Sequence, residues 1–215
     1  MRFSDRVEAG KQLGTALKKY SGEDTIVLGI PRGGVVTGFY VAAELEAPLD
    51  VIVPKKLGAP MNPELAVGAV TEEGEAIIDE NLVERLGITQ SYIDEEAEGM
   101  KEEIQRRLEV YRSDRTYPTL TDRVVILVDD GIATGATMRA GIASVKSRSP
   151  RKLVVGVPVA PPTSVREIES QVDEVVALVT PTPFYAIGQF YERFPQNTDE
   201  QVIRLLEENR DRFGN

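Results

Sequence analysis

Two adjacent carboxylates, Asp129 and Asp130, follow a run of five apolar residues, Val124 to Val128. The length and β-branched content of this run are typical of a strand that is buried on both faces of a parallel sheet. A loop of small residues follows the carboxylates, and the residues after it have helical spacing. The carboxylates are therefore expected at the carboxyl end of a strand. Because an ionised carboxylate accepts hydrogen bonds from hydroxyl groups, such a pair suits a vicinal diol.

The loop after these carboxylates indicates a second kind of binding. Backbone N–H groups at the start of a helix, with the positive end of the helix dipole behind them, bind a phosphate monoester. Five residues would form this phosphate loop, and two of them add hydroxyl donors: Ala133, Thr134, Gly135, Ala136 and Thr137. A phosphate site beside a diol site predicts a ribose 5-phosphate. The alternative is that Asp130 only caps a turn, as Asp often does.

Residues 124–137 resemble the phosphoribosyl-diphosphate (PRPP) motif of the type I phosphoribosyltransferases. The resemblance implies that Asp129 and Asp130 hold the ribose hydroxyls, act in catalysis and contact Mg²⁺ through water, and that the phosphate loop holds the 5-phosphate. Two positions depart from the family pattern. Gly131 stands where an aliphatic residue is usual, which should loosen the loop. Ala133 stands where the 6-oxopurine enzymes carry an Asp as general base, which argues against hypoxanthine or guanine as the acceptor.

A similar unit of strand, glycine turn and helix begins earlier, at Thr25. Residues 25–30 are apolar, and the sequence Pro31-Arg32-Gly33-Gly34 follows them directly. Tight packing of a turn between a strand and a helix would explain the glycines. The turn also resembles the pyrophosphate loop of the same family. That resemblance implies that Arg32 and Gly33 bind pyrophosphate, that Arg32 acts in catalysis by stabilising the leaving group, and that a cis peptide precedes Arg32.

Two lysines, Lys55 and Lys56, follow a third apolar strand at Leu49 to Val53. At the carboxyl end of a parallel strand they would meet phosphate charge, although adjacent lysines are also common on solvated surfaces. In the family, a similarly placed basic residue contacts pyrophosphate. The resemblance therefore assigns both lysines to the pyrophosphate, with Lys55 acting in catalysis. The Gly and Pro content of Leu57 to Glu64 predicts a mobile loop that closes over the site.

Residues 71–118 are expected to form a helical insertion. Residues 71–110 contain 13 acidic and 4 basic residues. A short helix from Asp79 to Leu86 should end at Gly87. A longer helix should follow, because apolar residues recur at steps of three and four: Ile93, Ala97, Met100, Ile104, Leu108 and Tyr111. We expect this helix to act as a lid or as the contact of a homodimer, with plain packing on the rest of the chain as the alternative.

Residues 180–197 are expected to form a small hood over the site. They gather four aromatic residues, Phe184, Tyr185, Phe190 and Tyr191, in a segment whose Pro and Gly content disfavours a regular helix. In the family the corresponding segment covers the acceptor base. The resemblance therefore makes Phe184 and Tyr185 candidates for the base pocket, whereas an aromatic core beneath a loop is the alternative. A final amphipathic helix is expected at residues 198–213.

Composition limits the possible chemistry. The chain has 215 residues, no Cys and no His, so catalysis would use carboxylates, hydroxyls, Lys or Arg, backbone dipoles and a hard cation. The net charge of −10 argues against nucleic acid as the main partner. No stretch of 18 apolar residues and no apolar N-terminal signal occur, so we expect no membrane association and a cytoplasmic location.

The order of elements predicts one α/β domain spanning residues 1–215. Further strands are expected at residues 66–70, 75–78, 152–159 and 174–179, and helices lie between most of the apolar strands. This alternation is typical of a parallel, Rossmann-like sheet with its ligands at the carboxyl ends of the strands. With the resemblance, it predicts a Mg²⁺-dependent phosphoribosyltransferase that acts on PRPP and a small-molecule acceptor, most simply a nucleobase. A non-catalytic, PRPP-binding regulatory protein is the alternative.

Overall fold

The computed structural model describes residues 2–72, 74–112 and 118–213. Its body is built on a five-stranded sheet in which every neighbouring pair is parallel, in the order β2-β1-β6-β7-β8. The strands are β1 (Thr25–Gly29), β2 (Leu49–Val51), β6 (Val124–Val128), β7 (Lys152–Val159) and β8 (Glu174–Val179). The register pairs Gly29 with Val128, so β1 and β6 end side by side. The two loops predicted to bind ligand therefore leave the sheet at adjacent points.

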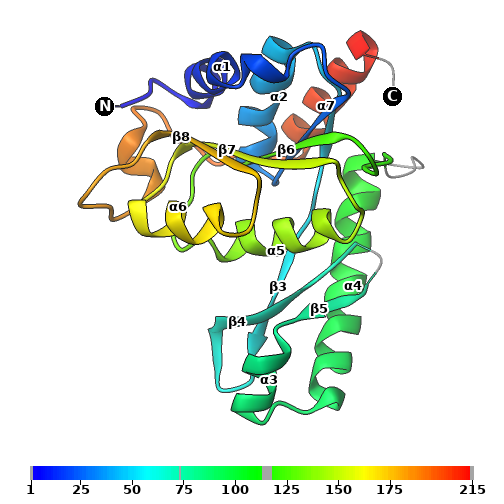
Figure 1. The fold of residues 1–215 in the computed structure, drawn as a ribbon. Helices are drawn as coiled ribbons and strands as arrows, with labels where there is room; N and C mark the ends of the chain where they lie inside the picture. The colour runs from blue at the N-terminus through cyan, green and yellow to red at the C-terminus, as the bar shows by residue number, and fades with distance from the viewer. Residues whose placement is uncertain (1, 73, 113–117, 214–215) are drawn as a thin grey trace.

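Helices cover both faces of this sheet, as the sequence predicted (Figure 1). One face carries α1 (Arg6–Ala16), η1 (Lys18–Tyr20), α2 (Gly33–Leu45) and α7 (Asp199–Phe213), and the other carries α5 (Ala136–Lys146) and α6 (Pro162–Glu169). Alternate residues of each central strand enter the two cores, Val27 on the first face and Ile26 on the second. No helix within the described ranges is both long enough and apolar enough to span a bilayer.

A second unit, here called the arm, projects from the body (Figure 1). It runs from residue 55 to residue 112 and contains β3 (Lys55–Ala59), β4 (Asn62–Val70), β5 (Ala76–Ile78), α3 (Glu80–Leu86) and α4 (Gln90–Arg112). Its three strands form an antiparallel sheet in the order β3-β4-β5. The short helix α3 is capped by Asp79 and ends at Gly87, whose φ of 63° is left-handed. The sequence predicted the end at Gly87 and placed the start one residue too early, at Asp79.

The apolar stripe of α4 is covered within this chain. Ile93 packs in the core of the arm, whereas Ala97, Ile104 and Tyr111 belong to the same core as α7. Plain packing therefore accounts for the stripe.

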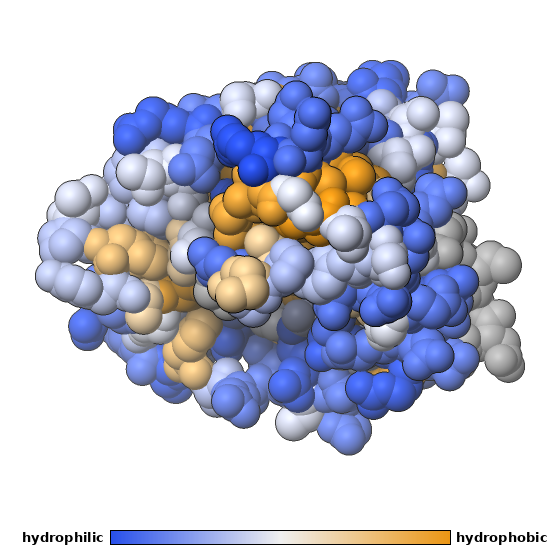
Figure 2. All heavy atoms as spheres, turned by 90° about the horizontal axis from the view of Figure 1, so that it is seen from below, coloured by the Kyte–Doolittle hydropathy of each residue, from blue (hydrophilic) through white to orange (hydrophobic). Residues whose placement is uncertain are grey.

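The free end of the arm exposes apolar side chains. Met61 is 96% exposed, and Leu65 and Leu86 are 38% and 44% exposed. Together with Pro60, Ile88 and Tyr92 they line a hollow of about 500 Å³. Figure 2, which views the molecule from the side toward which the arm projects, shows an apolar area surrounded by hydrophilic residues.

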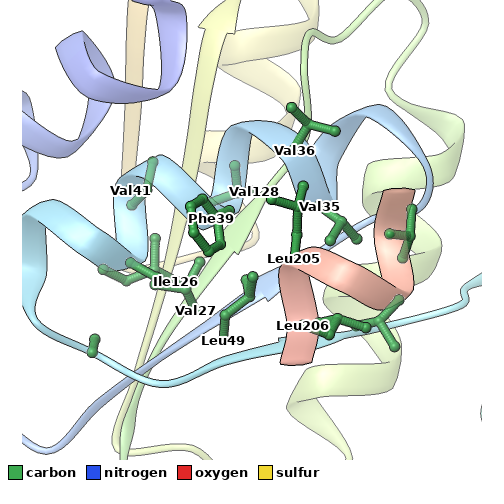
Figure 3. Close-up of a cluster of buried hydrophobic side chains, with 14 of the residues drawn as sticks. Val27, Val35, Val36, Phe39, Val41, Leu49, Ile126, Val128, Leu205 and Leu206 are labelled. Carbon is green, nitrogen blue, oxygen red and sulfur yellow. The ribbon is translucent and has the colours of Figure 1, made fainter. Parts of the chain in front are cut away.

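The largest apolar core lies between the sheet and helices α2 and α7 (Figure 3). Val27 and Ile126 of the sheet, Phe39 of α2 and Leu206 of α7 all belong to it, and each is at most 5% exposed. This core fixes α2 against the sheet. The turn from Pro31 to Gly34, here called the glycine loop, leads into that helix, and its two glycines are the first residues of α2.

The structure differs from the sequence prediction between Leu57 and Glu64. This segment, which was predicted to be a loop, is a β-hairpin in which β3 and β4 turn at Pro60 and Met61. The register shifts on both sides of Gly58, where an added Cβ would lie 2.6 Å from the carbonyl oxygen of Pro63. Gly and Pro thus occupy an irregular strand pair, which they tolerate better than a regular one.

Candidate functional site

The phosphate loop and Asp129 surround one cavity of about 150 Å³ at the carboxyl end of β6. Gly135 has a φ of 78° and directly precedes α5, so the backbone N–H groups that begin this helix face the loop. Two side chains hold the loop in place: Ser164 Oγ donates to the carbonyl of Ala133 at 2.7 Å, and Arg139 Nη1 donates to that of Thr134 at 3.1 Å. The structure thus gathers the residues predicted to hold a phosphate monoester.

The two carboxylates have different surroundings. Asp129 lines the cavity, and its Oδ1 accepts a hydrogen bond from the backbone N–H of Asp130 at 2.8 Å. Asp130 is only 8% exposed and points to Arg6, whose Nε lies 2.7 Å from Asp130 Oδ2. Only one member of the predicted diol-binding pair therefore faces the cavity.

Burial dominates the electrostatics of this pair. Desolvation, and next the negative charge of Asp130, raise the pKa of Asp129 well above its ordinary value. Desolvation also raises the pKa of Asp130, although the guanidinium of Arg6 opposes the rise. A positive charge brought into the cavity would relieve the repulsion between the carboxylates. The pair therefore favours a ligand that carries or develops positive charge.

Arg6 is a site residue that the sequence interpretation missed. Its guanidinium is buried, donates to the carbonyl oxygen of Pro195 at 2.8 Å and lies 3.8 Å from the ring centroid of Phe194. It thereby ties the hood to the PRPP motif. One signal in the sequence was available. A basic residue in the first turn of a helix is unfavourable with the helix dipole, so its presence there indicates a partner elsewhere in the structure.

The glycine loop packs directly against the PRPP motif. A Cβ added to Gly33 would lie 1.9 Å from Asp130 Oδ2, and one added to Gly34 would lie 2.6 Å from the carbonyl oxygen of Val128. The peptide between Pro31 and Arg32 is cis, as the family resemblance implied. Close packing therefore requires both glycines, whatever ligand the loop binds.

The predicted basic residues do not line the phosphate-loop cavity. Arg32 is exposed and borders a separate cavity of about 360 Å³, on the arm side of the glycine loop. Lys55 begins β3 instead of ending β2, and its Nζ lies 2.6 Å from a carboxylate oxygen of Glu103 on α4. Lys56 is the next residue of the same strand. The premise that the lysines extend a parallel strand is wrong, because β2 ends at Val51.

The aromatic residues of the hood divide into core and surface. Phe190 and Tyr191 are buried with Phe3, and the Tyr191 hydroxyl donates to the carbonyl of Asp130 at 2.6 Å, so an aromatic core describes these two. Phe184 stacks on Phe190 with ring centroids 5.4 Å apart, whereas Tyr185 is 82% exposed.

The hood reaches the cavity through Ile187, which lies in η2 (Ile187–Phe190). A Cβ on Gly131 would lie 2.6 Å from Ile187 Cγ2. Gly131 therefore makes room for the hood. The expectation that it loosens the loop is wrong, because its surroundings are closely packed.

Comparison with known proteins places this chain in a family. The model of the phosphoribosyl transferase domain matches residues 8–192. The "Putative phosphoribosyl transferase Rv0571c" of Mycobacterium tuberculosis is 42% identical over 205 residues, which are 95% of this chain and 46% of that protein, so this chain spans about half the length of that relative. The crystal structure of TT1426 from Thermus thermophilus has a TM-score of 0.91 at 44% identity and covers 97% of this chain and 99% of its own. The chain therefore belongs to the type I phosphoribosyltransferase family.

Proposed function

We propose that this chain transfers the 5-phosphoribosyl group of PRPP to a nitrogen atom of a nucleobase and releases pyrophosphate. The observation that carries the proposal is the cavity at the end of β6, where Asp129 and the phosphate loop surround one space. A sugar hydroxyl would meet a carboxylate there, and a phosphate would meet helix N–H groups. Membership of the family supports PRPP as the donor.

The residues present suit this reaction. The bond between ribose C1 and a diphosphate oxygen breaks, a bond between C1 and the acceptor nitrogen forms, and the acceptor loses its proton to solvent. Positive charge develops on the ribose ring as the first bond breaks. Asp129 would stabilise that charge, because it lines the cavity and is desolvated. The neighbouring Asp130 would add its negative charge from behind Asp129, although it is paired with Arg6. Positioning and charge stabilisation are enough here, since pyrophosphate is a good leaving group.

We propose that Mg²⁺ enters with PRPP. Within the described residues no group of three or more acidic, His or Cys side chains could hold a metal ion, so the protein alone offers only a partial site. Asp129 and Asp130 fit a hard cation that keeps its waters and is held mainly by the diphosphate of the substrate. When bound, the ion would neutralise charge on the leaving group.

We propose an acceptor other than hypoxanthine or guanine. Ala133 has no side chain that could act as a base, and no Lys occurs in the hood after β8. Phe184 and Ile187 are the hood residues that we propose contact the acceptor base. Ile187 lines the cavity, and Phe184 packs on the same apolar core of the hood as Ile187. Tyr185 is a weaker candidate, since most of its side chain faces solvent.

The test is a pyrophosphate-release assay with PRPP, Mg²⁺ and a panel of purine and pyrimidine bases. We expect release with a base other than hypoxanthine and guanine, and none for Asp129→Asn. Binding of PRPP without release for any base would favour a non-catalytic, PRPP-binding protein. Failure to bind PRPP at all would contradict the assignment of the cavity.

We also propose that the protein forms a homodimer through the free end of the arm. The support is the hollow of about 500 Å³ bordered by the exposed Met61, Leu65 and Leu86, which a second copy would cover. Sedimentation velocity should show a dimer that Leu65→Ser with Leu86→Ser weakens. A monomer at all concentrations would contradict this part of the proposal.

A further inference from the structure

Three arginines surround a cavity on the arm side of the glycine loop, here called the arginine pocket. Arg32 comes from the glycine loop, and Arg106 and Arg107 come from α4. The remaining lining residues are Pro31, Val110, Tyr111 and Asp199, and the volume is about 360 Å³. The body and the arm thus contribute cations to one space.

The charge of this pocket contrasts with its setting. Residues 71–110 carry 13 acidic and 4 basic side chains, yet two of those four basic residues, Arg106 and Arg107, line the pocket. Asp199 is the one carboxylate among the lining residues, and it accepts a hydrogen bond from the Tyr111 hydroxyl at 2.6 Å. The pocket is therefore a local positive region in an acidic protein.

The arginines retain most of their capacity to bind an anion. In the part of the chain that the structure describes, neither Arg32 nor Arg106 forms an ion pair within 4.0 Å. Arg107 Nη2 lies 2.9 Å from Glu103 Oε1, and the second oxygen of Glu103 lies 2.6 Å from Lys55 Nζ. Glu103 therefore pairs with both Arg107 and Lys55, and neither Glu103 nor Lys55 is among the lining residues of the pocket.

The contacts of the glycine loop relate this pocket to the phosphate loop. Gly33 packs against Asp130, while Pro31 and Arg32 face the arginine pocket. The same short loop therefore touches the PRPP motif with one part and the pocket with another. A ligand bound at both places would extend from ribose across this loop.

We propose that Arg32, Arg106 and Arg107 bind a diphosphate group, so that the arm supplies two cationic side chains to the leaving-group side of the site. Guanidinium groups bind phosphate oxygens through paired, charge-assisted hydrogen bonds, and several of them suit a ligand with two phosphates. The inference rests on the proposed function, because that function supplies a diphosphate. It assigns to Arg106 and Arg107 the role that the sequence resemblance gave to Lys55.

The test is isothermal titration with inorganic pyrophosphate, inorganic phosphate and ribose 5-phosphate. Arg106→Gln with Arg107→Gln is compared with Arg85→Gln and Arg166→Gln, two exposed arginines outside the pocket whose loss changes the net charge equally. We expect pyrophosphate affinity to fall at least about tenfold in the first variant and to stay unchanged in the control. Ribose 5-phosphate affinity should stay unchanged in both.

The three ligands separate the possible failures. Equal pyrophosphate affinity in the pocket variant and the control would overturn the arginine pocket, while binding of ribose 5-phosphate would leave the proposed function standing. Absence of ribose 5-phosphate binding to the unaltered protein would count against the proposed function itself. Phosphate that binds as tightly as pyrophosphate, and with the same dependence on Arg106 and Arg107, would overturn the diphosphate as the ligand.

Discussion

The body and the arm differ in how completely their residues are buried. Every residue of β1 and β6 is buried, because helices cover both faces of the parallel sheet. In the arm, β5 is only half-buried and α3 has no buried residue, and Met61 at the turn is almost fully exposed. A sheet with fully buried central strands thus carries the PRPP motif, whereas a more exposed unit carries Arg106 and Arg107.

The two regions meet in a buried ionic cluster. Arg112, at the end of α4, pairs with Asp50 of β2 at 3.0 Å and with Glu72 at 3.4 Å, and Arg148 also lies 3.4 Å from Glu72. Glu72 is 7% exposed and accepts a further hydrogen bond from the backbone N–H of Val53 at 3.3 Å. Charged groups, rather than an apolar core alone, thus join the arm to the body.

The largest effect is expected from Arg6→Ala in the body. The variant would leave Asp130 buried without its partner, which typically costs about 3 to 5 kcal/mol of unfolding free energy. Denaturant unfolding would measure the loss.

Arg193→Ala is the matched control, because the Arg193–Asp5 pair has the same 2.7 Å distance but side chains that are 71% and 27% exposed. We expect the control to lose much less stability. Equal losses would show that Arg6 contributes no more than a surface ion pair.

The next effect is expected from Gly33→Ala. The new methyl group would lie against Asp130 Oδ2, so the carboxylate or the glycine loop must move. We expect the affinity for PRPP to fall by about a hundredfold, which corresponds to about 2.7 kcal/mol. Gly99→Ala on α4 is the control, since no atom apart from the adjoining residues and the backbone of its own helix lies within 4 Å of the added Cβ. Titration with PRPP would show whether only the first variant is impaired.

A smaller effect is expected from pH at the junction of body and arm. Burial raises the pKa of Glu72 from 4.5 to about 7, against the opposing charges of Arg112 and Arg148. Between these two values the folded protein keeps a proton that the unfolded chain has lost, so stability falls as the pH rises. The whole shift corresponds to about 3 kcal/mol, of which about 2 kcal/mol falls between about pH 5.5 and about pH 8.

Glu72→Gln isolates this contribution, because Asp129 and Asp130 still titrate in the variant. Urea unfolding of both proteins across that range should show the unaltered protein losing stability relative to Glu72→Gln as the pH rises. Parallel curves for the two proteins would mean that Glu72 does not titrate in this range.

The smallest effect is expected at the free end of the arm. Met61→Ser removes an apolar side chain that is 96% exposed, so the unfolding free energy should change by no more than about 0.5 kcal/mol. Thermal unfolding at low protein concentration, where a dimer would dissociate, is the measurement. A large loss under these conditions would show that Met61 is buried in solution within a single chain.

The sequence predicted the body better than the arm for a physical reason. Strands buried on both faces appear as continuous apolar runs, so the predicted bounds of β6, β7 and β8 agree with the structure, and those of β1 differ by one residue. The hairpin of β3 and β4 has Gly58 and Pro63 inside irregular strands. Local composition therefore indicated a loop where long-range pairing imposed a strand.

In the candidate site, too, local sequence patterns predicted only the contacts between residues that are close in the sequence. The phosphate loop and Asp129 lie close together in the sequence, and their positions around one cavity followed from one strand, loop and helix unit. Arg6 meets Asp130 across 124 residues, and Lys55 meets Glu103 across the arm. No local pattern encodes such contacts, because they depend on how the elements pack.

The central claim is that the cavity at the end of β6 binds PRPP, and titration of PRPP with Mg²⁺ tests it most directly. Asp129→Asn keeps the pair of Asp130 with Arg6, and Asp129→Asn with Asp130→Asn removes both carboxylates. A control with Asp94→Asn and Asp211→Asn alters two exposed carboxylates. We expect tight binding to the unaltered protein and the control, weaker binding to the single variant and a loss of at least about a hundredfold in the double variant. Equal affinity in all four proteins would contradict the site.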